Sequence, residues 1–548
     1  MLCIKGGTVI DGRGGSPIPG ATILIDGERI KEIGPGAAVP VPQGAAVVEA
    51  SGKYILPGLI DSHVHYRDYM PELFLNHGVT SVKDTGNVPE WIVAQRDGIR
   101  KGKIPGPRVF IAGRTGAIKG FEVDIEPPGA FPPATKISSK ADAVELVKYL
   151  AARKVDQIKV GYGFSPELLS VISTESHSAG LQVTSHVTIS ARDAVASGID
   201  CLEHGTGVVQ ALVDEPIMAK VYQTSVIEKR TTCAFHLMRT AGFADLAAYL
   251  VDRGTRIVPD FILWAVAGSK RRSQYDLETL GVLRNQELSY IPPGRYFWWL
   301  KQNQHFWLDR RSLGETSDLR LKTLQDGYRR YQDFIAMFAE RGGRIITGTD
   351  TGFMLPGLSL HHELQEMVDA GISPMQALMS ATSIGADFLG ANGKDLGVLE
   401  KGKLADLVIV EGDPLKDISN TKNVVGVFQG GVKIETGYNP CFTNPLPSPR
   451  KMETHANRIP SIIDVEPFLV IEGEKDLEIR VTGSLFSRYA VLKFAGGRIP
   501  TKFITPSELK ATIPAPYLSR PGTFPIVVEN PPPDGGESHP AFIVVAFA

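Results

Sequence analysis

Two histidines separated by a single residue, His63 and His65, end an apolar run in this chain of 548 residues. In an extended strand, alternate side chains point to the same face, so both imidazoles are able to reach one metal ion. The apolar residues before them, Leu56 to Ile60, are typical of a buried parallel strand. The pair alone leaves two interpretations open, because two histidines also suit a polar cavity that holds no metal.

Four further polar residues stand in or at the ends of expected strands: Lys159, His186, His204 and Asp350. Taken singly, each has an ordinary explanation, such as a buried histidine, a helix N-cap or a lysine at a strand end. Together with the histidine pair, they are better explained by one shared site. Lys159 requires separate chemistry, because an ammonium group cannot ligate a cation and is costly to bury unpaired. One hypothesis, which the spacing itself does not show, is that its amine reacts with carbon dioxide to give a carbamate whose two oxygens can bridge two ions.

The elements that must position these residues alternate between apolar strands and amphipathic helices over residues 58–397. This order predicts an α/β fold, a (β/α)8 TIM barrel, in which catalytic residues gather at the C-terminal ends of the strands. A doubly wound sheet is the competing fold, but no Gly-x-Gly-x-x-Gly follows a strand. The expected strands cover residues 60–65, 79–84, 108–112, 157–160, 182–186, 201–204, 256–259 and 344–350. The clearest helical patterns cover residues 141–152, 166–179 and 328–341.

The flanks of the barrel have a different pattern, with short β-type runs between Gly- and Pro-rich turns. We expect residues 1–57 and 398–438 to form one composite β-sandwich, because short strand sets rarely stand alone. A Pro-rich linker is predicted at 439–458 and a separate immunoglobulin-like β-sandwich at 459–548. The barrel carries an aromatic-rich insertion at about 263–323, which either covers a pocket for an apolar substrate or packs into a small core of its own.

Composition excludes several classes of partner. The formal net charge of −2 gives no electrostatic case for nucleic acid or an anionic membrane. A small-molecule substrate is expected instead, with a homo-oligomer possible in principle. The cysteines at 3, 201, 233 and 441 have no paired spacing, which favours reduced thiols and a cytoplasmic protein. The first residues lack the pattern of a signal peptide, although an exported protein whose leader had been removed would look the same.

Several motifs resemble the amidohydrolase superfamily. The run Pro57-Gly58-Leu59-Ile60-Asp61-Ser62-His63-Val64-His65 resembles its first-strand signature. Residues 193–206, 347–350 and 361–382 resemble the imidazolonepropionase/prolidase-like branch, and 397–408 resembles the return of that family into its β-sandwich. The tail is similar to an IPT/TIG domain at residues 481–486, 509–514 and 527–531.

The resemblance implies a binuclear metal centre. It places His63, His65 and Asp350 on the more buried ion, His186 and His204 on the second ion, and a carboxylated Lys159 between the two. Zinc is the default metal for a hydrolytic site rich in histidine. The implied reaction is hydrolysis of an amide-type C–N bond by a hydroxide that bridges the ions, with Asp350 as the catalytic proton carrier. The implied substrates are peptide-like molecules, N-acyl amino acids or cyclic amides.

Two departures from the family pattern bear on the substrate. Thr188 stands where related carboxypeptidases often carry tyrosine, and residues 116–120 replace a Gly-Gly-His sequence. Both changes weaken the case for recognition of a free substrate carboxylate and, with the aromatic insertion, favour a bulkier or more apolar group. No substrate-binding residue is identified. The alternatives are a mononuclear deaminase or cyclic-imidate hydrolase and, in a different class, a non-catalytic scaffold.

Overall fold

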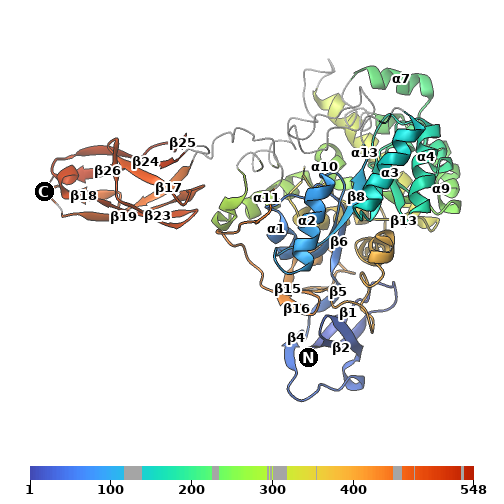
Figure 1. Ribbon diagram of the computed structural model, residues 1–548, viewed down its shortest axis with the longest axis horizontal. Coiled ribbons are helices and arrows are strands. Elements are labelled where there is room, and N and C mark those ends of the chain that lie inside the picture. Colours follow the sequence, from blue (N-terminus) through green and yellow to red (C-terminus); the bar gives the residue numbers. More distant parts are fainter. Residues whose placement is uncertain are drawn as a thin grey trace. The chain divides into compact units, whose positions relative to one another are not determined.

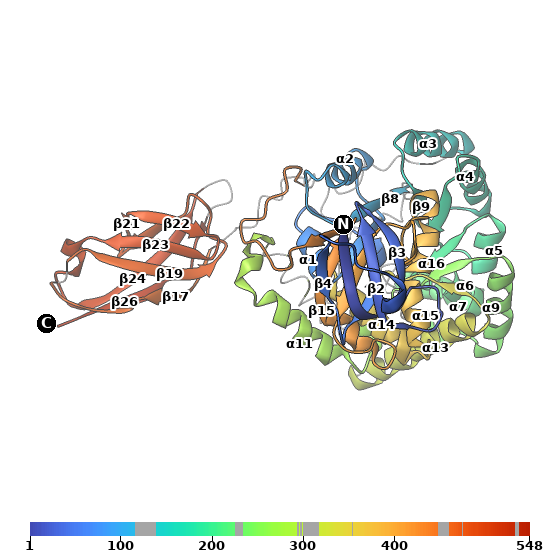
Figure 2. The same ribbon diagram turned by 90° about the horizontal axis from the view of Figure 1, so that it is seen from below.

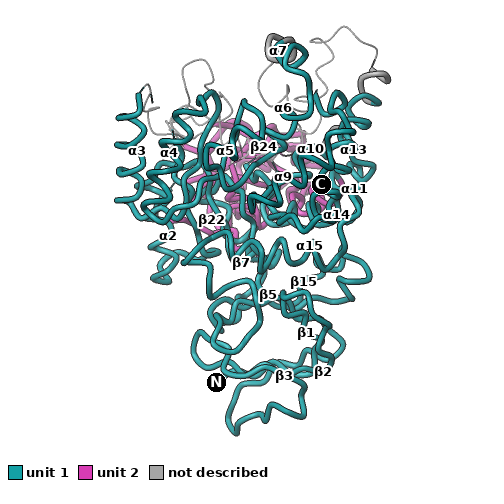
Figure 3. Tube along the Cα trace, turned by 90° about the vertical axis from the view of Figure 1, so that its right-hand side faces the viewer, with its two compact units in different colours: residues 1–276, 302–437, 446–449 teal, residues 277–301, 438–445, 450–548 magenta. Residues whose placement is uncertain are grey.

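The computed structural model describes residues 1–115, 137, 139–224, 234–292, 295, 299, 317–352, 354–447, 460–473, 475–531 and 536–547. The chain divides into two compact units (Figure 3). The first contains residues 1–276, 302–437 and 446–449, and the second contains 277–301, 438–445 and 450–548.

Eight parallel strands form the centre of the first unit (Figure 1). They pair in sequence order: β6 (Leu59–Val64), β7 (Val79–Asp84), β8 (Arg108–Arg114), β9 (Gln157–Val160), β10 (Gln182–Ser185), β11 (Cys201–Glu203), β12 (Arg256–Val258) and β13 (Arg344–Ile345). The curled sheet closes where the N–H of Ser62 donates to the carbonyl of Thr347 and that of Asp350 donates to His63, both at 2.9 Å. This confirms the predicted barrel and places β6 beside the segment that carries Asp350.

Helices follow the strands and cover the outside of the barrel. The helices described before β12 are α1 (Pro71–Asn76), α2 (Pro89–Arg100), α3 (Lys140–Ala152), α4 (Pro166–Ser178), α5 (Ala191–Ala196), α6 (Val208–Leu212), α7 (Glu215–Thr224) and α9 (Phe243–Asp252). Those that come later are α13 (Ser317–Glu340), α14 (Leu358–Asp369), α15 (Pro374–Ser380) and α16 (Ser383–Phe388). Serine side chains cap α3 and α4 at Ser139 and Ser165 by accepting backbone N–H groups.

Helix α13 begins well before the helical pattern predicted at residue 328. Gly327 lies inside it, and a Cβ there would stand 2.8 Å from the backbone nitrogen of His236. The glycine therefore allows a close approach of two segments, while its low helix propensity hid the first half of the helix from pattern analysis.

One mixed sheet joins the two flanks of the barrel. Its strands are β1 (Leu2–Val9), β2 (Ile18–Asp26), β3 (Arg29–Pro35), β4 (Ala46–Glu49), β5 (Tyr54–Pro57), β14 (Leu407–Val410), β15 (Val424–Gln429) and β16 (Val432–Ile434). The N- and C-terminal flanks meet where β5 and β14 pair antiparallel, with Ile55 opposite Ile409. Apolar side chains from both flanks fill one core, in which Ile4, Ile23 and Leu407 are fully buried. Because β5 leads directly into β6, the pairing also fixes the start of the first barrel strand.

The C-terminal residues fold into two facing sheets (Figure 2). One contains β17 (Ser461–Glu466), β19 (Leu477–Ser484), β22 (Thr501–Thr505) and β23 (Glu508–Ile513). The other contains β18 (Leu469–Ile471), β20 (Val491–Phe494), β21 (Gly497–Ile499), β24 (Gly522–Asn530), β25 (Gly536–Glu537) and β26 (Ala541–Ala546). Alternate residues point inward, and Val481, Leu492 and Ile526 are fully buried in the shared core. The β-sandwich agrees with the predicted class, and its IPT/TIG identity stays a prediction.

Several remaining predictions fall partly outside the described residues. Within the aromatic insertion lie α10 (Phe261–Gly268) and α11 (Arg272–Leu283), where Trp264 and Tyr275 are buried. Tyr296, Phe297, Trp298, Phe306 and Trp307 lie outside the described residues, as do residues 116–120, Cys233 and residues 448–458 of the expected linker. Cys3, Cys201 and Cys441 are free thiols. Among the described residues, no helix is long and apolar enough to cross a membrane.

Candidate metal centre

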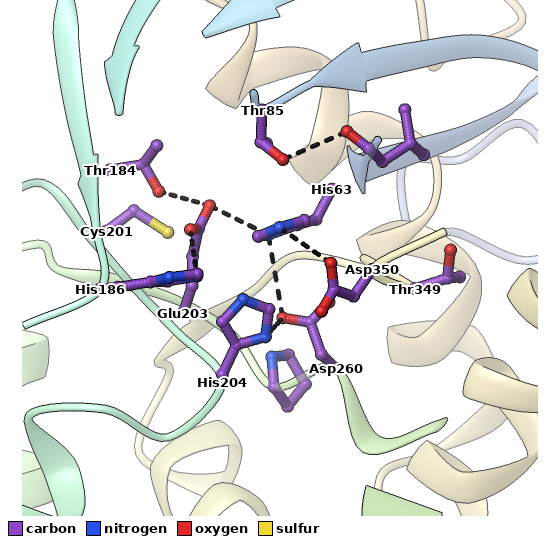
Figure 4. A network of polar contacts seen from close by, with 12 residues as sticks. His63, Thr85, Thr184, His186, Cys201, Glu203, His204, Asp260, Thr349 and Asp350 are labelled. Carbon is purple, nitrogen blue, oxygen red and sulfur yellow. Dashed lines mark hydrogen bonds and ion pairs between the residues drawn. The ribbon is translucent and has the colours of Figure 1, made fainter. Parts of the chain in front are cut away.

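The strand ends bring the predicted histidines together at one mouth of the barrel. The rings of His63 and His204 have centroids 4.5 Å apart, and those of His186 and His204 are 4.2 Å apart. His65 follows β6 directly, with its ring 5.7 Å from that of His63. Figure 4 shows His63, His186 and His204 facing a common centre with Asp350. The structure thus brings together residues that lie far apart in the sequence.

Two groups of possible ligand atoms overlap at His63. His63, His65 and Asp350 form one group, and His63, His186, Glu203 and His204 form the other; within each group the atoms lie within 4.8 Å of one another. In the first group, Oδ1 of Asp350 stands 3.0 Å from Nε2 of His65 and 3.5 Å from Nε2 of His63. This first group contains three of the residues that sequence analysis selected.

Glu203 is a member of the cluster that sequence analysis missed. Its Oε1 lies 3.3 Å from Nδ1 of His63, and its Oε2 lies 3.6 Å from Nε2 of His186. The hydroxyl of Thr184 donates to Oε1 at 2.7 Å. A carboxylate inside the apolar run Cys201-Leu202-Glu203 was the available signal, because a buried charge requires a partner.

Left-handed backbone conformations explain why neighbouring residues both reach the centre. His204, Asp260 and Asp350 have φ values of 58°, 47° and 50°, at the ends of β11, β12 and β13. Strict alternation would send His204 away from the face that Glu203 occupies. The positive φ breaks that alternation at a cost of about 1–2 kcal/mol per residue. Strain of this kind at three adjacent strand ends supports the mouth of the barrel as the candidate functional site.

Asp260 is a second carboxylate that sequence analysis missed. Its Oδ2 lies 2.8 Å from Nδ1 of His204 and 4.0 Å from Nδ1 of His63. Glu363 on α14 holds the adjoining turn by accepting the N–H groups of Phe261 and Ile262 at 2.9 and 2.6 Å. Asp260 follows Pro259 at the end of an expected strand. Asp350 was selected because catalytic residues of barrels gather at strand ends, and the same argument applied to Asp260.

Lys159 lies in β9 with its side chain almost fully buried, and its Nζ contacts Oε2 of Glu203. A second buried lysine, Lys83 in β7, has its Nζ 3.7 Å from Oε1 of Glu203. Burial lowers the pKa of Lys83 to about 8, and burial together with the charges of Lys83 and Arg114 lowers the pKa of Lys159 well below its ordinary value. Sequence analysis selected Lys159 but not Lys83.

Burial also sets the charge of the cluster. It lowers the pKa of His63 and of His186 well below the ordinary histidine value, and that of His204 to about 3. These imidazoles are therefore neutral near pH 7, the form in which a ring nitrogen can bind a metal. Burial raises the pKa of Asp350, but the hydrogen bond from His65 and the nearby histidines outweigh that effect and hold the pKa below its usual range.

Unsatisfied polar atoms test whether these residues fit metal ions. Both ring nitrogens of His63, Nε2 of His186 and both oxygens of Asp260 are buried without a hydrogen-bond partner among the residues described. Buried polar atoms are rarely left so, and such a set demands an explanation. Neutral imidazole nitrogens and carboxylate oxygens are the donors that zinc and similar divalent ions use. The donor set therefore fits divalent cations.

Aromatic rings border the cluster. The ring of Trp264 lies 6.4 Å from that of His204, and the ring of Tyr162 lies 5.1 Å from that of His186. Trp264 belongs to the predicted insertion but is buried beside the barrel mouth. An apolar wall next to a polar centre is usual for small-molecule sites.

Comparisons with known proteins agree with this geometry. Residues 329–434 match the amidohydrolase family. A dihydroorotase of Trichlorobacter lovleyi is 48% identical over 67 residues, which are 12% of this chain and 15% of that protein. An adenine deaminase of Rhizobium meliloti is 38% identical over 64 residues, 12% of this chain and 11% of that protein. The chain thus spans only about a seventh or less of the length of these curated relatives.

Structural similarity covers far more of the chain. A crystal structure of a Xaa-Pro dipeptidase with methionine bound in its active site superposes with a TM-score of 0.57 and 22% identity, over 79% of this chain and 99% of that chain. At this level of identity the likeness concerns the fold. The match to the amidohydrolase family covers residues 329–434, and the barrel and the strand-end cluster are in keeping with that match.

Proposed function

We propose that the protein is a metal-dependent hydrolase that holds two divalent ions and cleaves an amide-type C–N bond. The observation that carries this proposal is the pair of overlapping ligand groups that share His63. One group of this kind suits one ion, and two groups side by side suit two ions. The names of the adenine deaminase and the Xaa-Pro dipeptidase to which the chain is similar agree with chemistry at C–N bonds.

His63, His65 and Asp350 would hold one ion, and His186 and His204 the other, with Lys159 between them as a carbamate. To form it, the lone pair of the Lys159 amine bonds to the carbon of carbon dioxide, one C–O π bond breaks, and a proton leaves the nitrogen. When bound, the ions, which we expect to be zinc, would polarise the scissile carbonyl and make water a stronger acid.

Asp350 would carry the proton. Its low pKa keeps the carboxylate ionised, and its Oδ1 sits between the histidine rings of the first group. There the carboxylate can accept a proton from the attacking water and return it to the leaving nitrogen.

We expect substrates of the peptide-like, N-acyl amino acid or cyclic amide type. Trp264 and Tyr162 beside the histidines favour a bulky or apolar group next to the scissile bond.

A hydrolysis screen tests the proposed function. Protein loaded with zinc in bicarbonate buffer is offered N-acyl amino acids, dipeptides and lactams, and released amine is measured. We expect hydrolysis of members with an aromatic or large apolar group, and its loss after chelation and return with zinc. Turnover that survives complete removal of metal would contradict the proposal.

The metal content separates the alternatives. A mononuclear deaminase or cyclic-imidate hydrolase would bind one ion per chain and release ammonia or open an imide ring. A scaffold would bind none and hydrolyse nothing.

A further inference from the structure

Lys83 is a fully buried lysine to which the proposed chemistry assigns no role. It lies on β7, and its Nζ donates to Oε1 of Gln157 at 3.2 Å and stands 4.5 Å from the centre of the Phe388 ring. Its nearest carboxylate is that of Glu203, at 3.7 Å. A buried ammonium group is costly, so its retention beneath a metal centre calls for an explanation.

Glu203 separates Lys83 from Lys159. Its Oε1 faces Lys83 and accepts the hydroxyl of Thr184, whereas its Oε2 contacts Nζ of Lys159. Lys159 and Thr184 are register partners on β9 and β10, so their side chains share the inner face of the sheet. The two oxygens of the Glu203 carboxylate thus face two different lysines, Oε1 toward Lys83 and Oε2 toward Lys159.

The charges of these three residues do not balance when both lysines carry a proton. Among these three buried residues, two ammonium groups and one carboxylate leave one positive charge in excess. Carboxylation of Lys159 removes that excess, because its ammonium becomes an anionic carbamate that faces the cations. Lys83 and Glu203 then remain as a one-to-one ion pair.

The carbamate nitrogen also keeps one N–H. Since Oε2 of Glu203 contacts this nitrogen, it is placed to accept that N–H. A hydrogen bond there would fix rotation about the C–N bond of the carbamate and aim both of its oxygens away from Glu203.

We propose that Lys83 and Glu203 form a positioning pair for carboxylated Lys159: Glu203 accepts its N–H, and Lys83 offsets the negative charge of Glu203. This inference rests on the proposed function, because it presupposes the carbamate. Carbon dioxide is the co-reactant. Its carbon gains the bond to Nζ, one C–O π pair moves to oxygen, and the proton lost from nitrogen passes to solvent.

Direct observation of the carbamate tests the pair. Metal-free protein is reconstituted with zinc and ¹³C-bicarbonate, and the carbamate carbon is counted by ¹³C NMR over a bicarbonate titration, with zinc per chain measured in parallel. The variants are Lys83→Met and Glu203→Leu, and Lys401→Met serves as a control on an exposed lysine away from the site. Circular dichroism and thermal melting show whether each variant folds.

The wild type and Lys401→Met should show one labelled carbon per chain. Lys83→Met should need at least about tenfold more bicarbonate to reach the same labelling, because the unpaired carboxylate of Glu203 then repels the carbamate. Glu203→Leu, which lacks any acceptor for the carbamate N–H, should lose the label and the second zinc ion. If either single variant fails to fold, the double variant Lys83→Met/Glu203→Leu replaces both charges by apolar groups, which buried pairs commonly tolerate. It should fold and remain unlabelled.

The outcomes distinguish the two proposals. An unlabelled wild type would remove the carbamate and with it this part of the proposed function. If the wild type is labelled and the variants are labelled at the same bicarbonate concentration, the carbamate stands and only the positioning role of Lys83 and Glu203 is overturned.

Discussion

At the ends of three neighbouring strands, His204, Asp260 and Asp350 have positive φ values, and each points a polar group at the same centre. Tertiary hydrogen bonds impose these conformations: the N–H of His204 donates to Val258, and that of Asp350 donates to His63. The site therefore depends on backbone angles that cost energy as well as on the identity of its side chains.

At this scale, Lys159→Ala should lose metal and activity together. Removing the amine eliminates the carbamate and leaves Glu203 without one of its two cationic partners. We expect zinc per chain to fall and turnover to drop by about 10³-fold or more, as for loss of a group that acts as part of a unit. Lys401→Ala is the control. Full metal occupancy with normal turnover in Lys159→Ala would exclude the bridging role.

Asp260→Asn isolates the role of the second carboxylate. Asparagine tolerates the left-handed conformation of this position, so the fold should persist. The loss of charge next to Nδ1 of His204 should weaken zinc binding about 10- to 100-fold, as for other groups that orient metal ligands. Competition with a chelator of known affinity measures the change. Unaltered affinity would show that Asp260 does not act on the metal centre.

At the scale of elements, sequence patterns located most of the barrel. The expected strands at 79–84 and 157–160 agree with β7 and β9, because their buried apolar runs have clear ends. The eighth strand was expected to reach residue 350, but ladder pairing ends at Ile345, and the remaining residues bond to β6 in an irregular segment. The sequence carried a signal for Glu203 and for Asp260, but it could not show that both reach the cluster, because this depends on the positive φ values of His204 and Asp260 and on the hydrogen bonds that Glu363 accepts across the fold.

The junction between α1 and α14 predicts a pH dependence of stability. Nδ1 of His77 donates to the carbonyl of Leu73 at 2.8 Å, and Nε2 of His361 donates to the carbonyl of His77 at 2.9 Å. Burial lowers the pKa of His77 to about 4, from 6.5. The unfolded chain then binds the proton first, so stability should fall as pH drops from about 6.5 to 4, by up to about 3 kcal/mol.

Urea unfolding of metal-free protein at pH 7 and pH 5 measures this effect. The His77→Gln variant lacks the titrating group and should lose less stability across the same interval. Equal losses in wild type and variant would rule out His77 as a source of the pH dependence.

At the scale of the whole chain, the first unit is held together by contacts between the barrel and the mixed sheet. Arg108 on β8 donates from Nε and Nη2 to the two oxygens of Asp406, at 2.7 and 3.0 Å, and the N–H of Gly430 donates to the same carboxylate at 2.7 Å. The chain flanks thus support the barrel strands that position the candidate metal centre.

Asp406→Asn should lower the free energy of unfolding by about 1.5–3 kcal/mol, the range for hydrogen bonds to charged groups. Glu400→Gln removes a comparable but exposed pair with Arg13 and should cost less than about 1 kcal/mol. Denaturant titration of both variants makes the comparison. Equal losses would show that the buried pair contributes no more than an exposed one.

The central claim is that one barrel mouth holds two divalent ions. The most direct test is the zinc content of the full chain after reconstitution with excess zinc and bicarbonate and removal of loosely bound metal, measured by mass spectrometry of the element against protein concentration. The account predicts two zinc ions per chain for the wild type and at most one for His186→Ala/His204→Ala. One ion or none in the wild type would contradict it.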